Sequence, residues 1–156
     1  MILWGIVGRK NAGKTTLTER LVAELTGRGL VVSTLKRTHH ALDLDVPGTD
    51  SHRHREAGAR QVLLASDARV TLMEEVRQPT LTDLLGRLAP CDVVLAEGWK
   101  HGSHPRIEVW REACGASPLA ADDPTIAAIA CDTDPGTEHP RLDVDDIAGI
   151  ADWISR

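Results

Sequence analysis

The chain has 156 residues, and its 18 basic and 23 acidic side chains give a formal net charge of −5. Hydrophobic residues make up 42% and charged residues 26% of the sequence, far from a disordered or membrane composition. The chain has no Tyr or Phe, which excludes the aromatic base-stacking surfaces of RNA-binding domains, and the negative charge argues against bulk binding to nucleic acid. We therefore expect a single domain over residues 1–156 with no nucleic-acid partner.

Cysteine usage and the N-terminal run indicate the compartment. Cys91, Cys114 and Cys131 are odd in number and form no C-x-x-C pair, so neither a disulfide framework nor a structural zinc site is indicated. The apolar run over residues 2–7 is too short for a signal peptide or a membrane span. We expect a cytoplasmic protein that does not bind membranes.

Apolar runs and helical repeats alternate along the chain. Residues 2–7 predict a strand buried on both faces, and the helical spacing of leucines from Lys14 onward predicts a helix that Gly27 and Gly29 end. Residues 30–35 predict the next strand, which completes a βαβ unit. The later expectations are helices over 53–59, 81–88 (capped by Thr80 or Thr82) and 144–153, and strands over 61–65, 69–73 (partly exposed), 93–96, 107–110 and 125–130. This order predicts a three-layer α/β fold with a mostly parallel central sheet flanked by helices.

A phosphate-binding loop follows the first predicted strand. Residues 8–15 match G-x-x-x-x-G-K-[ST] at every fixed position and open the first predicted helix, which predicts a P-loop NTPase. The loop N–H groups and the helix N-terminus would bind phosphate oxygens, Lys14 would reach the β- and γ-phosphates, and Thr15 would ligate Mg²⁺. The candidate nucleotide-binding residues are Gly8, Arg9, Lys10, Asn11, Ala12, Gly13, Lys14, Thr15 and Thr16.

Acidic residues near this loop are candidate metal ligands. Glu97 ends the strand over 93–96, where a carboxylate can hold Mg²⁺ directly or through water. Asp92 starts that strand and would lie at the wrong end of a parallel sheet, so we expect a cap or a surface charge there. Asp50 begins the second helix, where it could act as the N-cap, as a third oxygen near the metal, or as both.

Four histidines, His39, His40, His52 and His54, lie close together in the sequence. Imidazole clusters can bind transition metals, but no pair has the spacing of an H-E-x-x-H helix. The nearby arginines Arg37, Arg53 and Arg55 favour an anion-binding cleft instead.

Several segments carry a family resemblance: Lys36-Arg37-Thr38-His39-His40, Pro47-Gly48-Thr49-Asp50-Ser51, Ala57-Gly58-Ala59 and Glu97-Gly98-Trp99-Lys100. In this order after the phosphate loop, they resemble the molybdopterin-guanine dinucleotide biosynthesis protein B (MobB) family over nearly the whole chain. The resemblance implies a homodimeric GTP-binding protein with weak GTPase activity that assists molybdenum cofactor biosynthesis. The implied partner is the nucleotidyltransferase that joins GMP to molybdopterin, and molybdopterin itself is a candidate ligand.

The resemblance also assigns residues. It implies that residues 8–16 bind GTP and that Glu97 is the acid of the second nucleotide motif. Arg37 departs from the lysine common in the family, and Lys10 and Asn11 stand where small residues are frequent, which leaves nucleotide binding intact. Trp99 is either a pterin-facing aromatic or an exposed side chain in a dimer contact.

Guanine selection and hydrolysis need further groups. A carboxylate can accept both adjacent N–H donors of guanine, so we expect Asp132 first, and Asp134 second, to select the base; an Asx-turn is the alternative. Lys14, Mg²⁺ and the loop amides would neutralise the γ-phosphoryl, and Glu97 or a residue of the 43–50 loop could position water. Arg9 or Lys10 could act across a dimer interface, but the sequence identifies no arginine finger, so we expect slow turnover. Two other functions remain open for the whole chain: a small-molecule kinase and a GTP-dependent metallochaperone.

Overall fold

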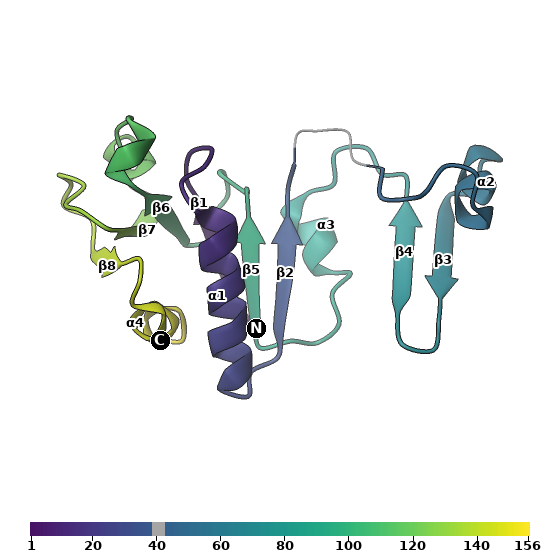
Figure 1. Ribbon diagram of the computed structural model, residues 1–156, viewed down its shortest axis with the longest axis horizontal. Helices are drawn as coiled ribbons and strands as arrows, with labels where there is room; N and C mark the ends of the chain where they lie inside the picture. The colour runs from purple at the N-terminus through teal and green to yellow at the C-terminus, as the bar shows by residue number, and fades with distance from the viewer. Residues whose placement is uncertain (39–42) are drawn as a thin grey trace. The chain divides into compact units, whose positions relative to one another are not determined.

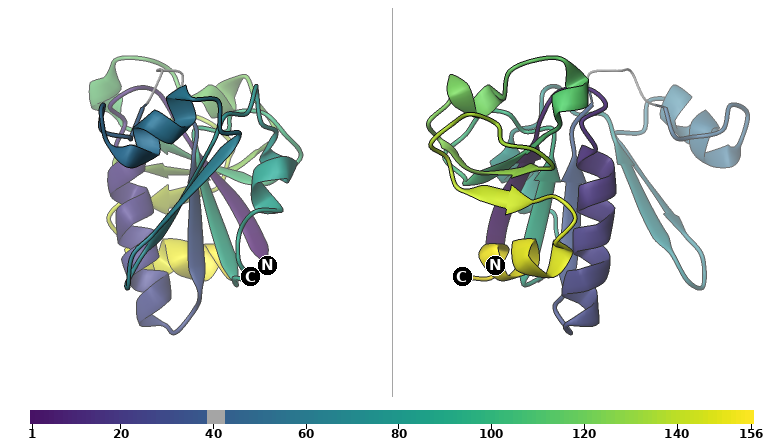
Figure 2. Two further views of the ribbon diagram at one scale, coloured as in Figure 1. Left: turned by 90° about the vertical axis from the view of Figure 1, so that its right-hand side faces the viewer. Right: turned by 60° about the vertical axis from the view of Figure 1, so that its left-hand side comes forward.

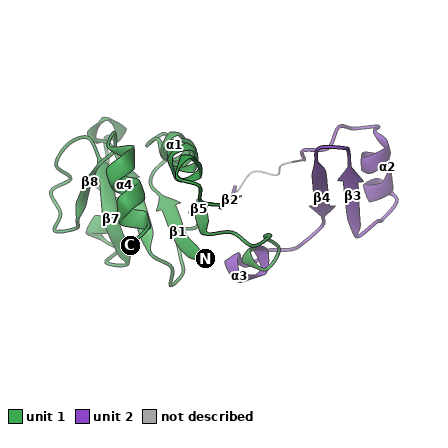
Figure 3. Ribbon diagram, turned by 90° about the horizontal axis from the view of Figure 1, so that it is seen from below, with its two compact units in different colours: residues 1–37, 85–156 green, residues 38–84 purple. Residues whose placement is uncertain are grey.

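The computed structural model of the protein describes residues 1–38 and 43–156. The chain divides into two compact units, one formed by residues 1–37 and 85–156 and the other by residues 38–84 (Figure 3). His39 and His40 of the predicted histidine cluster lie outside the described residues. No helix in the described parts of the chain is both long and apolar enough to cross a membrane.

The first unit is built on a six-stranded sheet with the strand order β2-β5-β1-β6-β7-β8 (Figure 1). Every neighbouring pair in this sheet is parallel, which confirms the predicted fold class. The strands are β1 (Ile2–Val7), β2 (Val32–Lys36), β5 (Val93–Glu97), β6 (Arg106–Trp110), β7 (Ile126–Cys131) and β8 (Arg141–Asp143). The last, β8, is too short for a sequence pattern to reveal and was not predicted.

Two helices, α1 (Lys14–Gly27) and α4 (Ile147–Ile154), pack against each other and against one face of this sheet (Figures 1 and 2). Leu17, Leu21 and Leu25 of α1 are buried at helical spacing, as the leucine pattern predicted. The predicted helix over 144–153 begins only at Ile147, because the side chain of Asp146 caps it by accepting the N–H of Gly149 at 2.9 Å.

The opposite face of the sheet carries a second core cluster. Val7 and Ile129 belong to it, whereas their strand neighbours Ile6 and Ala130 belong to the helix-covered face, as the alternation of side chains along a strand requires. The 3₁₀ helix η2 (Leu119–Ala121) contributes Ala120 to this cluster, and a second 3₁₀ helix, η1 (Glu112–Cys114), follows β6. The sheet is therefore covered on both sides near β6 and β7.

The second unit contains α2 (Asp50–Glu56) and an antiparallel hairpin of β3 (Gln61–Ala65) and β4 (Val70–Glu74). Both strands were predicted, but only four residues join them, too few for the crossover that a parallel pair needs, so they form a sheet of their own. Arg55 of α2 stabilises this unit through ion pairs with three carboxylates, those of Asp43 at 2.8 Å, Asp45 at 3.3 Å and Glu75 at 2.8 Å.

A short helix, α3 (Leu81–Leu85), spans the boundary between the two units in the sequence. Thr80 caps it as predicted, since its hydroxyl oxygen accepts the N–H of Asp83 at 3.1 Å. The helix is shorter than the predicted 81–88, and its leucines are half-buried whereas Thr82 and Asp83 are exposed, so the leucine repeat marks the more protected side of a helix with no fully buried residue.

Candidate functional site

The phosphate loop connects β1 to α1 and has the backbone that its glycines allow. Gly8 has a φ of 144°, and a Cβ there would collide with the carbonyl oxygen of Val109 at the end of β6. Gly13, with a φ of 99°, is the N-cap of α1 and provides no side-chain cap, and the first turn of α1 holds no acidic residue. The first N–H groups of the helix therefore remain available to an anion. They face a hollow of about 360 Å³ lined by Asn11, Gly13, Lys14, Thr15 and Thr16.

The ammonium group of Lys14 folds back onto the loop and donates to the carbonyl oxygen of Arg9 at 2.7 Å. Burial lowers the pKa of Lys14, and the positive charges of Lys100 and Lys36 lower it further, whereas the carboxylate of Glu97 opposes the shift. Lys36 at the end of β2 and Lys100 after β5 therefore add positive charge near Lys14.

Thr15 and Glu97 meet behind the loop. The Thr15 hydroxyl donates to the two carboxylate oxygens of Glu97 at 3.0 and 3.3 Å, and Glu97 is only 8% exposed. The parallel register that pairs Ile6 with Glu97 brings the end of β5 beside the loop, as predicted. Because a hydroxyl and a carboxylate are hard oxygen donors, this pair fits a Mg²⁺ ion that also binds phosphate.

Lys36, which was not predicted as a site residue, joins this pair. Its Nζ atom lies 3.4 Å from the Glu97 carboxylate and 3.4 Å from the Thr15 hydroxyl. The register of β2 against β5 sets Lys36 directly opposite Glu97. The sequence feature that could have identified Lys36 is its position at the end of a predicted parallel strand. Asp92 lies at the other end of β5, where it accepts the N–H of Val31 at 2.8 Å, as expected.

Asp50 and its neighbours belong to the second unit. Asp50 begins α2 as predicted, but the N-cap is Thr49, whose hydroxyl accepts the N–H of His52 at 3.4 Å, so the predicted cap was wrong by one residue. The Asp50 side chain is 93% exposed and lies 3.9 Å from Arg53. Its role as a metal ligand stays a prediction. His52 and His54 both lie on this helix, and the described residues contain no group of three or more His, Cys, Asp or Glu that could hold a metal ion.

Two expectations about neighbouring side chains were wrong. Arg55 is occupied by its three carboxylates and is therefore not a free group for an anion-binding cleft. Trp99 is only 6% exposed, and the guanidinium of Arg37 stacks 4.9 Å from the centre of its ring. The Trp99 ring is thus part of the protein interior and not an exposed aromatic.

The candidate base-selecting residues follow β7. The side chain of Asp134 accepts the N–H of Gly136 at 2.9 Å, so this residue forms the Asx-turn that was the alternative to base selection. Asp132 instead accepts a hydrogen bond from Arg111 at 2.9 Å. Arg111 directly follows β6 and was not predicted as a site residue; its position at the carboxyl end of a parallel strand, beside the loop, was the available signal.

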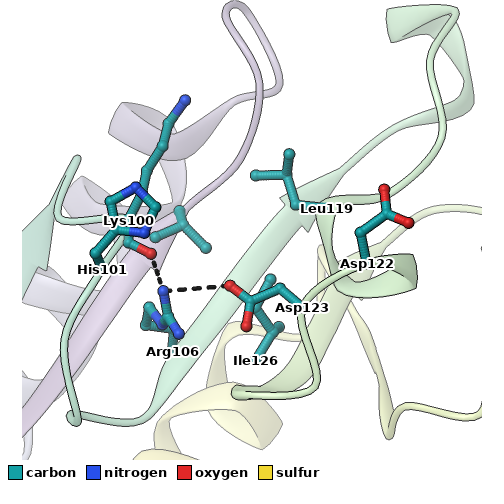
Figure 4. Close-up of a pocket in the computed structure, with 8 residues that line it drawn as sticks. Lys100, His101, Arg106, Leu119, Asp122, Asp123 and Ile126 are labelled. Carbon is teal, nitrogen blue, oxygen red and sulfur yellow. Dashed lines mark hydrogen bonds and ion pairs between the residues drawn. The ribbon is translucent and has the colours of Figure 1, made fainter.

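A separate cavity of about 310 Å³ lies near the start of β6 and β7 (Figure 4). Its floor contains Arg106, which is 3% exposed and donates to the Lys100 carbonyl and the Thr125 hydroxyl and pairs with Asp123 at 3.4 Å. Gly5 leaves room for this side chain, because a Cβ there would lie 2.7 Å from Cγ of Arg106. Arg106 therefore ties together the segments before β6 and β7.

The parallel sheet, with a glycine-rich loop between its central strand and α1, defines an α/β protein of the P-loop NTPase fold. Residues 3–132 match the family described as "Molybdopterin guanine dinucleotide synthesis protein B" (MobB). The chain belongs to this family.

Curated relatives and solved structures support the same family. Proteins named molybdopterin-guanine dinucleotide biosynthesis adapter protein are similar to this chain in Haemophilus influenzae (38% identity, 97% of this chain and 86% of the relative) and Escherichia coli (36%, 91% and 85%). A crystal structure of molybdopterin-guanine biosynthesis protein B matches with a TM-score of 0.78 at 27% identity, covering 98% of this chain and 96% of the other. A MobB homologue from Bacillus stearothermophilus matches with a TM-score of 0.74 at 25% identity, covering 99% and 98%.

Proposed function

We propose that the protein is an adapter in molybdopterin-guanine dinucleotide biosynthesis that binds GTP and Mg²⁺ at its phosphate loop. The observation that carries the nucleotide site is the contact between Thr15 and Glu97 behind a complete phosphate-loop motif. The names of relatives at 36% and 38% identity support the adapter role. A cytoplasmic location and a contact with molybdopterin stay expectations of the sequence.

The chain's own groups would share the work as follows. The N–H groups at the start of α1 and the Lys14 ammonium would bind the phosphates, and Thr15 and Glu97 would hold Mg²⁺, which neutralises phosphate charge when bound. Glu97 is nearly buried and already contacts Thr15 and Lys36, so it is poorly placed to activate a water molecule as well. We therefore propose slow hydrolysis of GTP, with the nucleotide acting mainly on conformation.

A homodimer is part of the proposal, and the hairpin of the second unit supports it. One face of this hairpin carries three exposed apolar side chains, those of Leu63, Val70 and Leu72. They share this face because Leu63 pairs with Leu72 and Ala65 pairs with Val70. Val62 on the opposite face is buried. A contiguous exposed apolar surface of this kind is typical of a protein–protein contact.

The adapter role is tested by binding to the nucleotidyltransferase that joins GMP to molybdopterin. We expect the two proteins to associate, with an affinity that differs between the GTP-bound and the nucleotide-free protein. The Lys14→Ala variant should behave as the nucleotide-free protein whether or not GTP is added. An affinity that is the same in all of these states would contradict a nucleotide-dependent adapter.

A further inference from the structure

The side chain of Arg111 lies between the phosphate loop and Asp132. Its Nη1 atom donates to Oδ2 of Asp132 at 2.9 Å, and its Nε atom lies 3.7 Å from the position that a Cβ on Gly13 would take. Gly13 is the residue at which the loop passes into α1. One arginine therefore borders both the predicted phosphate site and the predicted base-selecting carboxylate.

The sheet fixes this position. Val109 of β6 packs its carbonyl group against Gly8 at the start of the loop, and the parallel register pairs Trp110 with Cys131 at the ends of β6 and β7. Arg111 and Asp132 are the first residues after these strands, so they leave the sheet side by side. Their proximity follows from strand pairing and not from a chance meeting of long side chains.

Both members of the pair are accessible to a ligand. The side chains of Arg111 and Asp132 are 35% and 36% exposed, and an ion pair in contact with water is weak. A diphosphate or triphosphate carries several negative charges and would compete well for the guanidinium. In the present structure the same contact takes one oxygen, Oδ2, of the carboxylate that a guanine base would need with both oxygens.

We infer that Arg111 and Asp132 form a latch that a nucleotide opens: the phosphates take the Arg111 guanidinium, and the released Asp132 carboxylate accepts the N–H donors of the base. This inference rests on the proposed nucleotide site and adds to it a residue that couples its two halves. The latch disfavours ligands that provide only a base or only a phosphate, because each must break the pair and satisfies only one of its members.

Inorganic pyrophosphate tests the latch because it has phosphates and no base. Its affinity is measured for the unchanged protein, Arg111→Ala, Asp132→Asn and the double variant. We expect Arg111→Ala to weaken pyrophosphate binding about tenfold, and Asp132→Asn to strengthen it about threefold by freeing the guanidinium. In the double variant the gain should disappear, because no guanidinium remains to be freed.

A matched ion pair elsewhere in the same unit provides the control. Arg20 pairs with Asp145 at 3.0 Å between α1 and the segment before α4, with similar exposure of the arginine. Arg20→Ala and Asp145→Asn should leave pyrophosphate affinity unchanged, and thermal unfolding checks that every variant is folded. A gain from Asp132→Asn that persists without Arg111, or no gain at all, overturns the latch.

The proposed function fails in a different way. GDP is titrated into the unchanged protein in parallel with pyrophosphate. If GDP does not bind, the nucleotide site itself is wrong and the latch falls with it. If GDP binds but Asp132→Asn leaves pyrophosphate affinity unchanged, the latch alone is wrong.

Discussion

Thr15 and Glu97 are 82 residues apart in the sequence, yet the Thr15 hydroxyl donates to the Glu97 carboxylate at 3.0 Å. The contact exists because β5 pairs directly with β1, so the acid at the end of one strand meets the loop that leaves the other. The oxygen donors that we propose for Mg²⁺ are thereby placed together before any ligand arrives, which would lower the cost of assembling such a site.

Replacing Thr15 should therefore weaken the binding of Mg²⁺ more than the binding of the nucleotide. We expect Thr15→Ala to raise the Mg²⁺ concentration needed for half-maximal GTP binding about tenfold, since one oxygen ligand is lost, while GTP binding without Mg²⁺ changes little. Thr15→Ser keeps the hydroxyl and should restore the Mg²⁺ response. Titration of Mg²⁺ at fixed GTP measures both. An unchanged Mg²⁺ response in Thr15→Ala would contradict the metal role of this residue.

The glycine at the start of the loop should tolerate no side chain. Gly8→Ala places a Cβ against the Val109 carbonyl at a φ of 144°, so we expect a loss of about 1–3 kcal/mol in the free energy of unfolding, together with loss of GTP binding. Gly29→Ala is the matched control: Gly29 also has a positive φ, 86°, but a Cβ there meets nothing within 4 Å. Chemical denaturation of the two variants separates the effect of the collision from that of backbone strain. An equal loss in the free energy of unfolding in both variants would refute the collision with the Val109 carbonyl.

The exposed face of the hairpin should hold two copies of the chain together. Leu63→Glu places a charge on the face shared with Leu72, and we expect it to shift the protein from dimer to monomer in light scattering coupled to size-exclusion chromatography. Leu64→Glu changes a leucine of similar exposure (55% against 65%) on the same strand but on the other face, and it should leave the dimer intact. A monomeric unchanged protein, or a dimer that survives Leu63→Glu, would refute this interface.

The second unit should lose stability in acid. The hydrogen bond from Arg55 holds the pKa of Asp43 below its ordinary value. A carboxylate with a lowered pKa in the folded state stabilises above its unfolded pKa, near 3.9, and this contribution is lost as the pH falls through the folded value. Asp43→Asn should thus lower the unfolding temperature at about pH 7, and this deficit should shrink steadily as the pH falls below about 4. Asp67→Asn in the hairpin turn is the control, and a deficit that persists in acid would contradict the linkage.

The sequence determines the local features of this fold well. The phosphate loop, the first strand and the strand over residues 61–65 carry their signals in neighbouring residues, and the structure confirms the predicted bounds of both strands. Glu97 was also predictable, because an acid after a buried strand must lie at the carboxyl edge of a parallel sheet.

What the sequence could not reveal depends on contacts between distant segments. Lys36 and Arg111 each follow a predicted strand, as Glu97 does, but the strand order and register that bring these strand ends beside the loop are encoded by no local pattern. The contact of the Trp99 ring with Arg37 joins residues that follow two different strands, and the separation of β3 and β4 into their own sheet depends on which strands pair. The choice of Thr49 over Asp50 as a helix cap is a shift of one residue between two side chains that both favour that position.

Equilibrium binding of GTP and ATP with Mg²⁺ tests most directly whether the phosphate loop binds a guanine nucleotide. We expect GTP to bind at least about tenfold more tightly than ATP, since a carboxylate can pair with the adjacent donors of guanine. Lys14→Ala should abolish this binding, whereas Arg20→Ala, which removes from the same helix an exposed positive charge that pairs with Asp145, should not. ATP binding as tight as GTP binding, or GTP binding that survives in Lys14→Ala, would contradict the account.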